Sequence, residues 1–226
     1  MENNIFPLKK YKNYTYKQVL DKNDTKYFKY LINNFKFLFE DIYDFYVYLR
    51  DNNKLVNEIN KCINIKILID TETTGFSNND LIVQIAYIVF NEYEIIKTFN
   101  QIIKINTLFK IKNSFIHGIN NLICEKNGIC IIDALNRLNN DIKYCNSIIG
   151  HNTIFDIRML KNEYLRNKID CTNFISKKIE DTMTIYGKRI KLGELYFKLF
   201  NNHMENAHNA IYDVLATYKI YNKLIN

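Results

Sequence analysis

Two carboxylates stand at the end of an apolar run in the segment NIKILIDTETTGF, residues 64–76. The β-branched residues before them predict a buried strand, and Gly75 predicts a turn after it. Side chains two apart on a strand point to the same face, so we expect Asp70 and Glu72 to converge. Crowded carboxylates repel each other unless a cation or a proton lies between them. Such hard oxygen ligands suit Mg²⁺ or Mn²⁺, although a solvated strand end would show the same pattern.

Two further motifs supply acids that could reach the same place. The motif GHNTIFD puts Asp156 after a short strand and in the first turn of a helix, where the helix dipole favours a carboxylate. Asn152 is placed to cap that turn. The motif AHNAIYD puts His208 five residues before Asp213, which is about 140° around a helix. We therefore expect His208 in the loop ahead of the last helix and Asp213 in its first turn.

Together these residues form a set suited to hydrolysis. Asp70, Glu72, Asp156 and Asp213 carry four negative charges, which two divalent cations would neutralise. Two metal ions about 4 Å apart can activate a water and stabilise the leaving oxygen of a phosphodiester. Histidine changes charge near neutral pH, so His208 is suited to deprotonate that water. The residues therefore predict metal-assisted phosphodiester hydrolysis.

The three motifs, taken in order, resemble those of the DEDDh exonucleases, the DnaQ-like proofreading family with the RNase H-like fold. They are DTETTG at 70–75, HNTIFD at 151–156 and HNAIYD at 208–213, and the resemblance covers residues 64–226. It implies a 3′→5′ exonuclease that releases nucleoside monophosphates. By the same resemblance the metal ligands are Asp70, Glu72, Asp156 and Asp213, and the general base is His208.

The resemblance also implies a set of substrate-binding residues. Phe76 could stack on a base or be buried at the turn. His117 stands in IHGIN, a string similar to one in proofreading exonucleases, and it either lies near the site or satisfies local backbone. The residues expected to bind the 3′-terminal nucleotide or lie near it are Thr73, Thr74, Gly75, Phe76, His117 and Asn152.

The elements that must position these residues can be predicted from apolar periodicity. Three apolar runs joined by short polar turns predict an antiparallel meander. Strands alternating with helices follow it, so the chain predicts an α/β fold, an RNase H-like mixed sheet flanked by helices. The expected strands are residues 65–70, 81–90, 95–105, 147–150 and 178–181, and the expected helices are 131–142, 154–165, one after Thr182, and 210–224.

Residues 1–60 differ from residues 61–226, and we expect a small helical module ahead of the exonuclease domain. Apolar residues at three- and four-residue steps predict one amphipathic helix over about residues 25–50, with Asp24 as its N-cap. This helix could dock a protein partner. The interleaved Lys and Tyr residues ahead of it can contact phosphates and bases, or form a solvated turn-and-helix unit. A loose resemblance to the terminal module of exodeoxyribonuclease X-like proteins rests on Lys10, Tyr11, Lys12, Val19, Asp24, Tyr27 and Leu31.

Composition limits the remaining possibilities. The net charge of +7 favours a polyanionic partner, and we expect nucleic acid, DNA rather than RNA. Five dispersed cysteines without metal-ligand spacing are typical of a reducing compartment inside the cell, such as cytoplasm or nucleus. The sequence has no apolar run long enough for a membrane span. Two alternatives to a DNA exonuclease stay open. One is an exoribonuclease of the same fold, and the other is a catalytically silent nucleic-acid-binding or polymerase-accessory protein. Five intact motif positions count against the silent protein.

Overall fold

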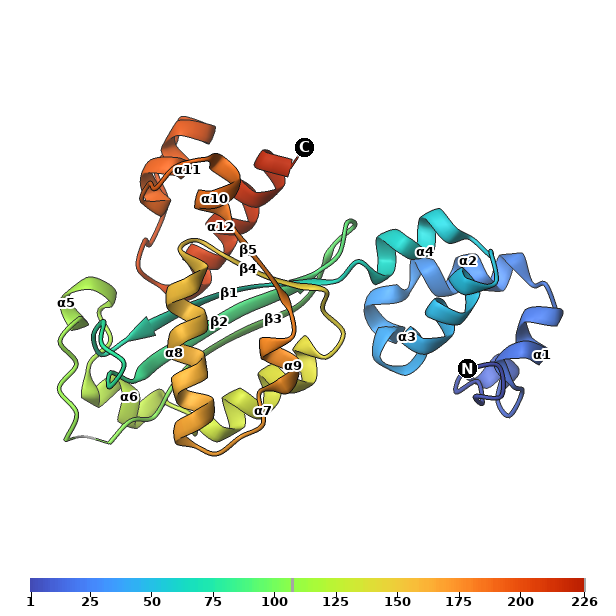
Figure 1. The fold of residues 1–226 in the computed structure, drawn as a ribbon, viewed down its shortest axis with the longest axis horizontal. Helices are drawn as coiled ribbons and strands as arrows, with labels where there is room; N and C mark the ends of the chain where they lie inside the picture. Colours follow the sequence, from blue (N-terminus) through green and yellow to red (C-terminus); the bar gives the residue numbers. More distant parts are fainter. Residues whose placement is uncertain (107, 226) are drawn as a thin grey trace. The chain divides into compact units, whose positions relative to one another are not determined.

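The fold is that of a computed structural model, which describes residues 1–106 and 108–225 (Figure 1). The chain divides into two compact units. The first comprises Met1–Ile65 and Phe90–Ile96, and the second comprises Lys66–Val89 and Lys97–Asn226. The expected boundary after residue 60 falls inside helix α4 (Val56–Ile63), whereas the two units divide at Ile65.

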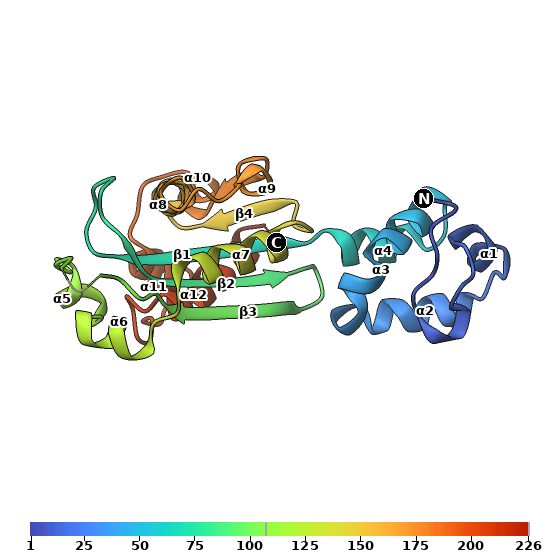
Figure 2. The same cartoon turned by 90° about the horizontal axis from the view of Figure 1, so that it is seen from below.

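The second unit is built on a five-stranded sheet with the order β3-β2-β1-β4-β5. The parallel pairings join β1 to β4 and β4 to β5. The meander of β1, β2 and β3 supplies the antiparallel part (Figure 2). This arrangement confirms the predicted RNase H-like mixed sheet. The strands are β1 (Lys66–Thr73), β2 (Ile82–Phe90), β3 (Ile95–Ile102), β4 (Ser147–Gly150) and β5 (Lys178–Asp181).

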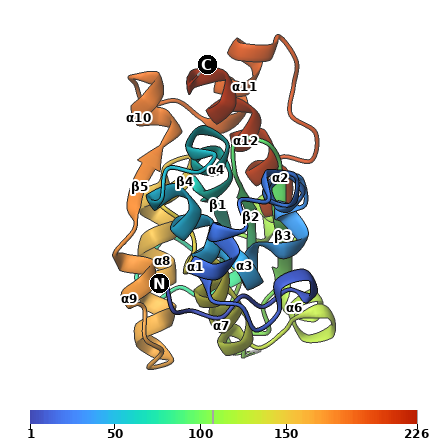
Figure 3. The same ribbon diagram turned by 90° about the vertical axis from the view of Figure 1, so that its right-hand side faces the viewer.

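Helices cover both faces of this sheet (Figures 1 and 3). Helices α7 (Ile131–Ile142) and α8 (Thr153–Arg166) lie on one face, and α12 (Ala210–Ile225) packs on the other against β1. Strand β2 is buried along its whole length, as its near-continuous apolar sequence requires. The shorter helices are α5 (Ser114–His117), α6 (Asn121–Asn127), α9 (Thr172–Ile175), α10 (Thr182–Tyr186) and α11 (Leu192–Phe200).

The first unit has one clear difference from the prediction. Two helices, α2 (Thr25–Asn33) and α3 (Phe35–Asp51), replace the single helix expected over residues 25–50. Asn34 separates them, because its side-chain amide donates to the carbonyl of Tyr30 at 2.8 Å and its backbone leaves the helical region at φ −111°. Asp24 caps α2 as expected, accepting from the backbone N–H of Tyr27. The first unit also contains the turn η1 (Lys9–Tyr11) and helix α1 (Tyr16–Asp21).

The apolar stripe of α2 and α3 is the core of this unit. Burial of its members leaves the stripe itself inaccessible to a docked partner. Its buried residues include Phe28, Leu31, Phe35, Phe39, Ile42, Tyr46 and Leu49. Over residues 1–106 and 108–225, none of the helices is both long and apolar enough to cross a bilayer.

Candidate metal centre

Three acids meet where β1 ends. Asp70 and Glu72 project from β1, and Asp213 projects from the first turn of α12. One carboxylate oxygen of each lies within 4.8 Å of the corresponding oxygens of the other two. The alternation of a strand puts Asp70 and Glu72 on one face, and the packing of α12 against β1 brings Asp213 to them. The structure therefore brings together three of the four acids expected to bind metal.

The fourth acid, Asp156, is held by the backbone between the first two. Its Oδ1 accepts hydrogen bonds from the N–H of Thr71 at 2.9 Å and from the Thr71 hydroxyl at 2.7 Å. Asp156 lies in the first turn of α8 and is buried. These two bonds tie α8 to β1. Thr71 was not among the predicted site residues, and its only sequence signal is its place between Asp70 and Glu72.

The four acids have raised pKa values because they lie close together and are withdrawn from solvent, Asp156 and Asp213 buried and Asp70 and Glu72 half-buried. Burial is the main cause at Glu72, whose pKa rises to about 8, and Asp213 and Asp156 add repulsion. Burial and the three neighbouring carboxylates also raise the pKa of Asp70 well above its ordinary value. The pKa of Asp213 rises to about 6 through burial, against the effect of His208. Burial raises the pKa of Asp156 to about 7, although the bonds from Thr71 oppose it.

The donor set fits a divalent metal ion. In the described part of the chain, no lysine or arginine forms an ion pair with any of the four acids. All the candidate ligand atoms are carboxylate oxygens, the type that Mg²⁺ and Mn²⁺ prefer. A divalent cation would supply the positive charge that these crowded acids lack.

His208 lies in the loop before α12, where the motif spacing requires it. Its backbone has a left-handed φ of +66°, and its side chain is exposed. The backbone N–H of His208 donates to both carboxylate oxygens of Asp213, at 3.3 and 3.2 Å. The loop that carries the candidate base is thus fixed to a candidate metal ligand.

Gln84 is a second residue that the sequence interpretation missed. It is buried in the middle of β2, and its Oε1 accepts from the N–H of Ala210 at 3.3 Å. Its amide donates to the side chains of Asn209 and Asn100. Gln84 therefore holds the first residue of α12 and the residue that follows His208. A lone amide inside an apolar strand was the available signal, because a buried polar group needs hydrogen-bond partners.

The turn after β1 uses most of the residues expected to cradle substrate. The Thr73 hydroxyl donates to the carbonyl of Gly75 at 2.6 Å, and the Thr74 hydroxyl donates to Asp80 at 3.0 Å. A Cβ atom on Gly75 would lie 2.6 Å from the Asp80 carboxylate, so a larger residue there would displace the turn. Phe76 alone of these four predicted residues has a side chain mostly in solvent, being 65% exposed. The two threonine side chains therefore shape the turn instead of facing solvent.

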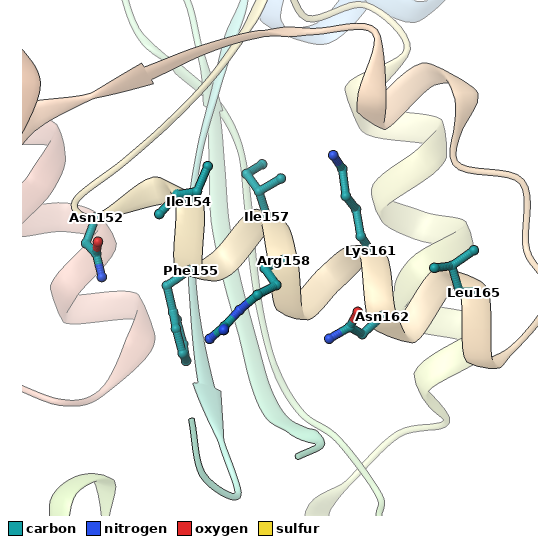
Figure 4. A pocket seen from close by; sticks show the side chains of 8 residues that line it. All are labelled: Asn152, Ile154, Phe155, Ile157, Arg158, Lys161, Asn162 and Leu165. Atoms are coloured by element: carbon teal, nitrogen blue, oxygen red, sulfur yellow. The ribbon is translucent and has the colours of Figure 1, made fainter. Parts of the chain in front are cut away.

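A groove runs along α8 next to this turn (Figure 4). Arg158 donates to the carbonyl of Phe76 at 2.9 Å, and the Phe155 ring meets the Phe76 ring edge-on at 6.1 Å. Asn152, expected to cap α8, makes no side-chain capping bond. Asp181 instead accepts from the backbone N–H groups of Asn152 and Thr153. The groove has a volume of about 660 Å³ and is lined by Asn152, Ile154, Phe155, Ile157, Arg158, Lys161, Asn162 and Leu165.

His117 is occupied on both ring nitrogens. Its Nδ1 accepts from the N–H of Ile119 at 3.1 Å, so Nε2 carries the proton and donates to the carbonyl of Thr73 at 3.2 Å. His117 therefore anchors the end of β1. His151 is bound similarly, to the Thr182 hydroxyl and the Ile190 carbonyl, each at 2.8 Å.

Residues 67–221 match the exonuclease family. Ribonuclease T of Buchnera aphidicola subsp. Baizongia pistaciae (strain Bp) is 30% identical over 185 residues, covering 71% of this chain and 83% of that protein. A structure of exonuclease I is similar in fold, with a TM-score of 0.63 and 21% identity over 72% of this chain and 40% of that chain. The structure of E. coli exonuclease I with a dT13 oligonucleotide has a TM-score of 0.62 and 21% sequence identity, covering 72% of this chain and 41% of that chain. The chain thus spans about two fifths of the length of these exonuclease I chains.

Proposed function

The chain belongs to the exonuclease family and is a metal-dependent 3′→5′ exonuclease, and on that premise we propose that its substrate is DNA. The substrate end is a single-stranded or mismatched 3′ terminus, shortened to nucleoside monophosphates in proofreading, repair or DNA degradation. The convergence of Asp70, Glu72 and Asp213 within 4.8 Å carries the metal-dependent hydrolysis, and the fold shared with exonuclease I supports DNA as the substrate.

In this proposal Asp70, Glu72, Asp156 and Asp213 would hold two Mg²⁺ or Mn²⁺ ions. When bound, the ions supply an activated water and neutralise charge at the phosphodiester. Two such ions would balance the four carboxylate charges without a lysine or arginine. Thr71 fixes the orientation of Asp156 through its hydroxyl and its backbone N–H.

His208 is the general base of the proposed reaction. A ring nitrogen of its imidazole takes the proton of the attacking water. The bonds from its backbone N–H to Asp213 place the loop beside a metal ligand. Because the side chain is exposed, the proton can pass on to bulk solvent.

The substrate strand is bound by the Phe76 turn and the adjoining groove. The exposed ring of Phe76 and its edge contact with Phe155 offer faces on which bases can stack. Arg158 and Lys161 line the same groove and carry the positive charge that phosphates require. His117 supports this surface through its bond to the carbonyl of Thr73.

DNA as the substrate is supported by the similar fold of exonuclease I, which has been solved with dT13 and dA16 oligonucleotides. A second candidate is a 3′→5′ exoribonuclease, favoured by the 30% identity to ribonuclease T. The two candidates share the metal site and differ in whether a 2′-hydroxyl is accepted.

Initial rates on matched substrates distinguish these candidates. The substrates are 5′-labelled dT20, rU20 and a DNA duplex with a mismatched 3′ end, digested in Mg²⁺ with chromatography of the mononucleotide products. We expect both DNA substrates to be shortened at least about tenfold faster than rU20, which corresponds to 1.4 kcal/mol of discrimination. Faster cleavage of rU20 would replace the DNA proposal with the exoribonuclease.

A further inference from the structure

The first unit contains a pocket that lies outside the family match and outside the metal centre. Its volume is about 510 Å³, and residues from the N-terminal segment, α2 and α3 line it. Aromatic and basic side chains both contribute, a combination that suits neither a purely apolar core nor a solvated surface. The lining residues are Leu8, Lys9, Lys10, Tyr27, Tyr30 and Leu38.

Tyr27 and Tyr30 form the aromatic wall of this pocket. Their rings are nearly parallel, 13° apart, with centroids separated by 5.9 Å. The Tyr27 ring is fixed from the inside by edge contacts with Phe6 and Tyr11, at 6.2 and 5.2 Å. Tyr30 is 54% exposed. An exposed ring held against a rigid parallel partner is a ready surface for stacking a base.

Asp24 holds the basic side of the pocket in place. Its carboxylate accepts from Lys10 Nζ at 2.6 Å and from the Tyr11 hydroxyl at 2.8 Å, while it caps α2 through Tyr27. Lys10 Nζ then lies 4.6 Å from the centre of the Tyr27 ring. The negative charge of Asp24 is therefore compensated within the unit, and the exposed Lys9 contributes its charge to the rim.

Positive charge is concentrated in the part of the unit that forms this pocket. Residues 1–34 contain seven lysines and three acids, whereas residues 35–65 contain four basic and five acidic residues. Lys26 is exposed and stands one helical turn before Tyr30 on α2. This charge is complementary to a phosphate backbone, and the adjacent tyrosines are complementary to its bases.

We propose that this pocket is a second nucleic-acid contact, which stacks a base of a single strand on Tyr30 and pairs the adjacent phosphates with Lys9 and Lys26. The inference rests on the proposed function only in taking the ligand to be a nucleic acid. The contact strengthens binding of the strand and lengthens each encounter. We assign it no part in hydrolysis, because none of its residues is among the acids of the metal centre.

The test measures binding of the full chain to 5′-fluorescein dT20 by fluorescence anisotropy in EDTA, where no turnover occurs. We expect Tyr30→Ala to weaken binding about tenfold, within the range of one lost base–aromatic stack, and Tyr30→Phe to retain it. Lys9→Ala and Lys26→Ala should each lower the slope of log affinity against log salt by about 0.7. Phe37→Ala is the matched control, since Phe37 is 80% exposed in the same unit but does not line the pocket.

An oligonucleotide made only of abasic residues separates stacking from charge. Tyr30→Ala should leave its affinity unchanged, while Lys9→Ala should weaken it. The proposal would be overturned if Tyr30→Ala bound dT20 as tightly as the native chain and Lys9→Ala left the salt slope unchanged. A protein would then be the ligand to test at this pocket.

Metal-dependent hydrolysis of the p-nitrophenyl ester of thymidine 5′-monophosphate is measured separately. We expect equal rates for Tyr30→Ala and the native chain, and absence of hydrolysis would count against the proposed function alone.

Discussion

At the scale of single residues, the candidate metal centre consists of two buried and two half-buried acids. Glu72, Asp156 and Asp213 have pKa values raised to about 8, 7 and 6, chiefly by burial. At pH 7 and without a cation, a carboxyl group with the pKa of Glu72 is mostly protonated and one with the pKa of Asp156 is about half protonated, whereas Asp213 is mostly ionised. Metal binding at this site must therefore release protons, and its affinity must rise with pH.

Thr71 offers a test of how the fourth acid is oriented. Thr71→Val removes the hydroxyl that donates to Asp156 at 2.7 Å but preserves the shape of the side chain. We expect the affinity for Mg²⁺, measured by calorimetry, to fall about tenfold, as is usual when a group supporting a metal ligand is lost. Thr71→Ser keeps the hydroxyl and should bind Mg²⁺ like the native chain. Equal Mg²⁺ affinities of the Val and Ser variants would show that the Thr71 hydroxyl does not orient Asp156 for metal binding.

At the scale of elements, the site forms only where one strand and two helices pack together. Strand β1 carries Asp70 and Glu72, α8 carries Asp156, and α12 carries Asp213. Thr71 joins α8 to β1, and Gln84 joins β2 to the start of α12. The chemistry is thus spread over elements that are far apart in sequence and fixed by two buried polar side chains.

Gln84→Leu should loosen the start of α12 and the loop that carries His208. The buried N–H of Ala210 would lose its acceptor, which costs about 1–3 kcal/mol of stability. We expect kcat to fall by roughly tenfold or more, because small displacements of a catalytic group cost up to about a hundredfold. Asn100→Ala is the control, since it removes a bond to Gln84 at 2.8 Å without touching α12. Unchanged kcat and melting temperature in Gln84→Leu would contradict this role.

Much of the fold was predictable from periodicity. The helix at 131–142 and the strands at 147–150 and 178–181 have the expected bounds. A polar residue follows the helix and polar residues flank the first of these strands, whereas the strand at 178–181 contains only one apolar residue. The break at Asn34 was not predictable, since the apolar period continues through it and only a local side-chain bond to Tyr30 ends the helix. The short helices α5, α6 and α9 have too few residues to show a period.

The candidate site was predictable in its acids and less so in its supports. Ordered motifs identified Asp70, Glu72 and Asp213, which the structure brings together. Thr71 and Gln84 act through hydrogen bonds to partners 85 and 126 residues away, and sequence spacing gives no access to such pairs. The inward turn of the Thr73 and Thr74 hydroxyls depends on Gly75 and Asp80 closing a tight turn, which is a property of the folded backbone.

At the scale of the whole molecule, the exonuclease family match covers the second unit and leaves the first unit almost entirely unmatched. The family match begins at residue 67, and the second unit begins at Lys66. The first unit lies almost entirely outside that match, so its role has to be inferred from its own residues. Its aromatic core and basic pocket make it a candidate for holding a strand whose end is cut by the second unit.

The stability of the second unit should depend on pH and metal together. The folded-state pKa of Glu72, about 8, lies above the ordinary value of about 4.3 expected for an unfolded chain. The folded state therefore binds more protons than the unfolded state. In EDTA, the contribution of Glu72 to the free energy of unfolding falls as pH rises from about 4 to about 8. Asp156 and Asp213 act in the same direction over narrower windows, ending near pH 7 and 6.

The difference between Mg²⁺ and EDTA isolates this effect. His117 and His151, whose pKa values burial lowers, act in the opposite direction below about pH 6.5, but they do so in both buffers. We expect Mg²⁺ at a hundredfold above its dissociation constant at pH 8 to raise the melting temperature by roughly 5–10 °C. The rise should be much smaller at pH 5.5, measured by calorimetric scans. An equal rise at both pH values would contradict the linkage.

The most direct test of the account is digestion of 5′-labelled dT20 by the native chain and by Asp213→Asn, in Mg²⁺ and in EDTA. We expect the native chain to give a ladder that shortens from the 3′ end in Mg²⁺ and is absent in EDTA. Asp213→Asn removes a metal ligand, so its rate should fall by more than about a hundredfold, beyond the loss seen for residues that only support a ligand. Its circular dichroism should match the native chain. A native rate in Asp213→Asn, or a ladder that persists in EDTA, would show that this cluster does not hold the catalytic metal.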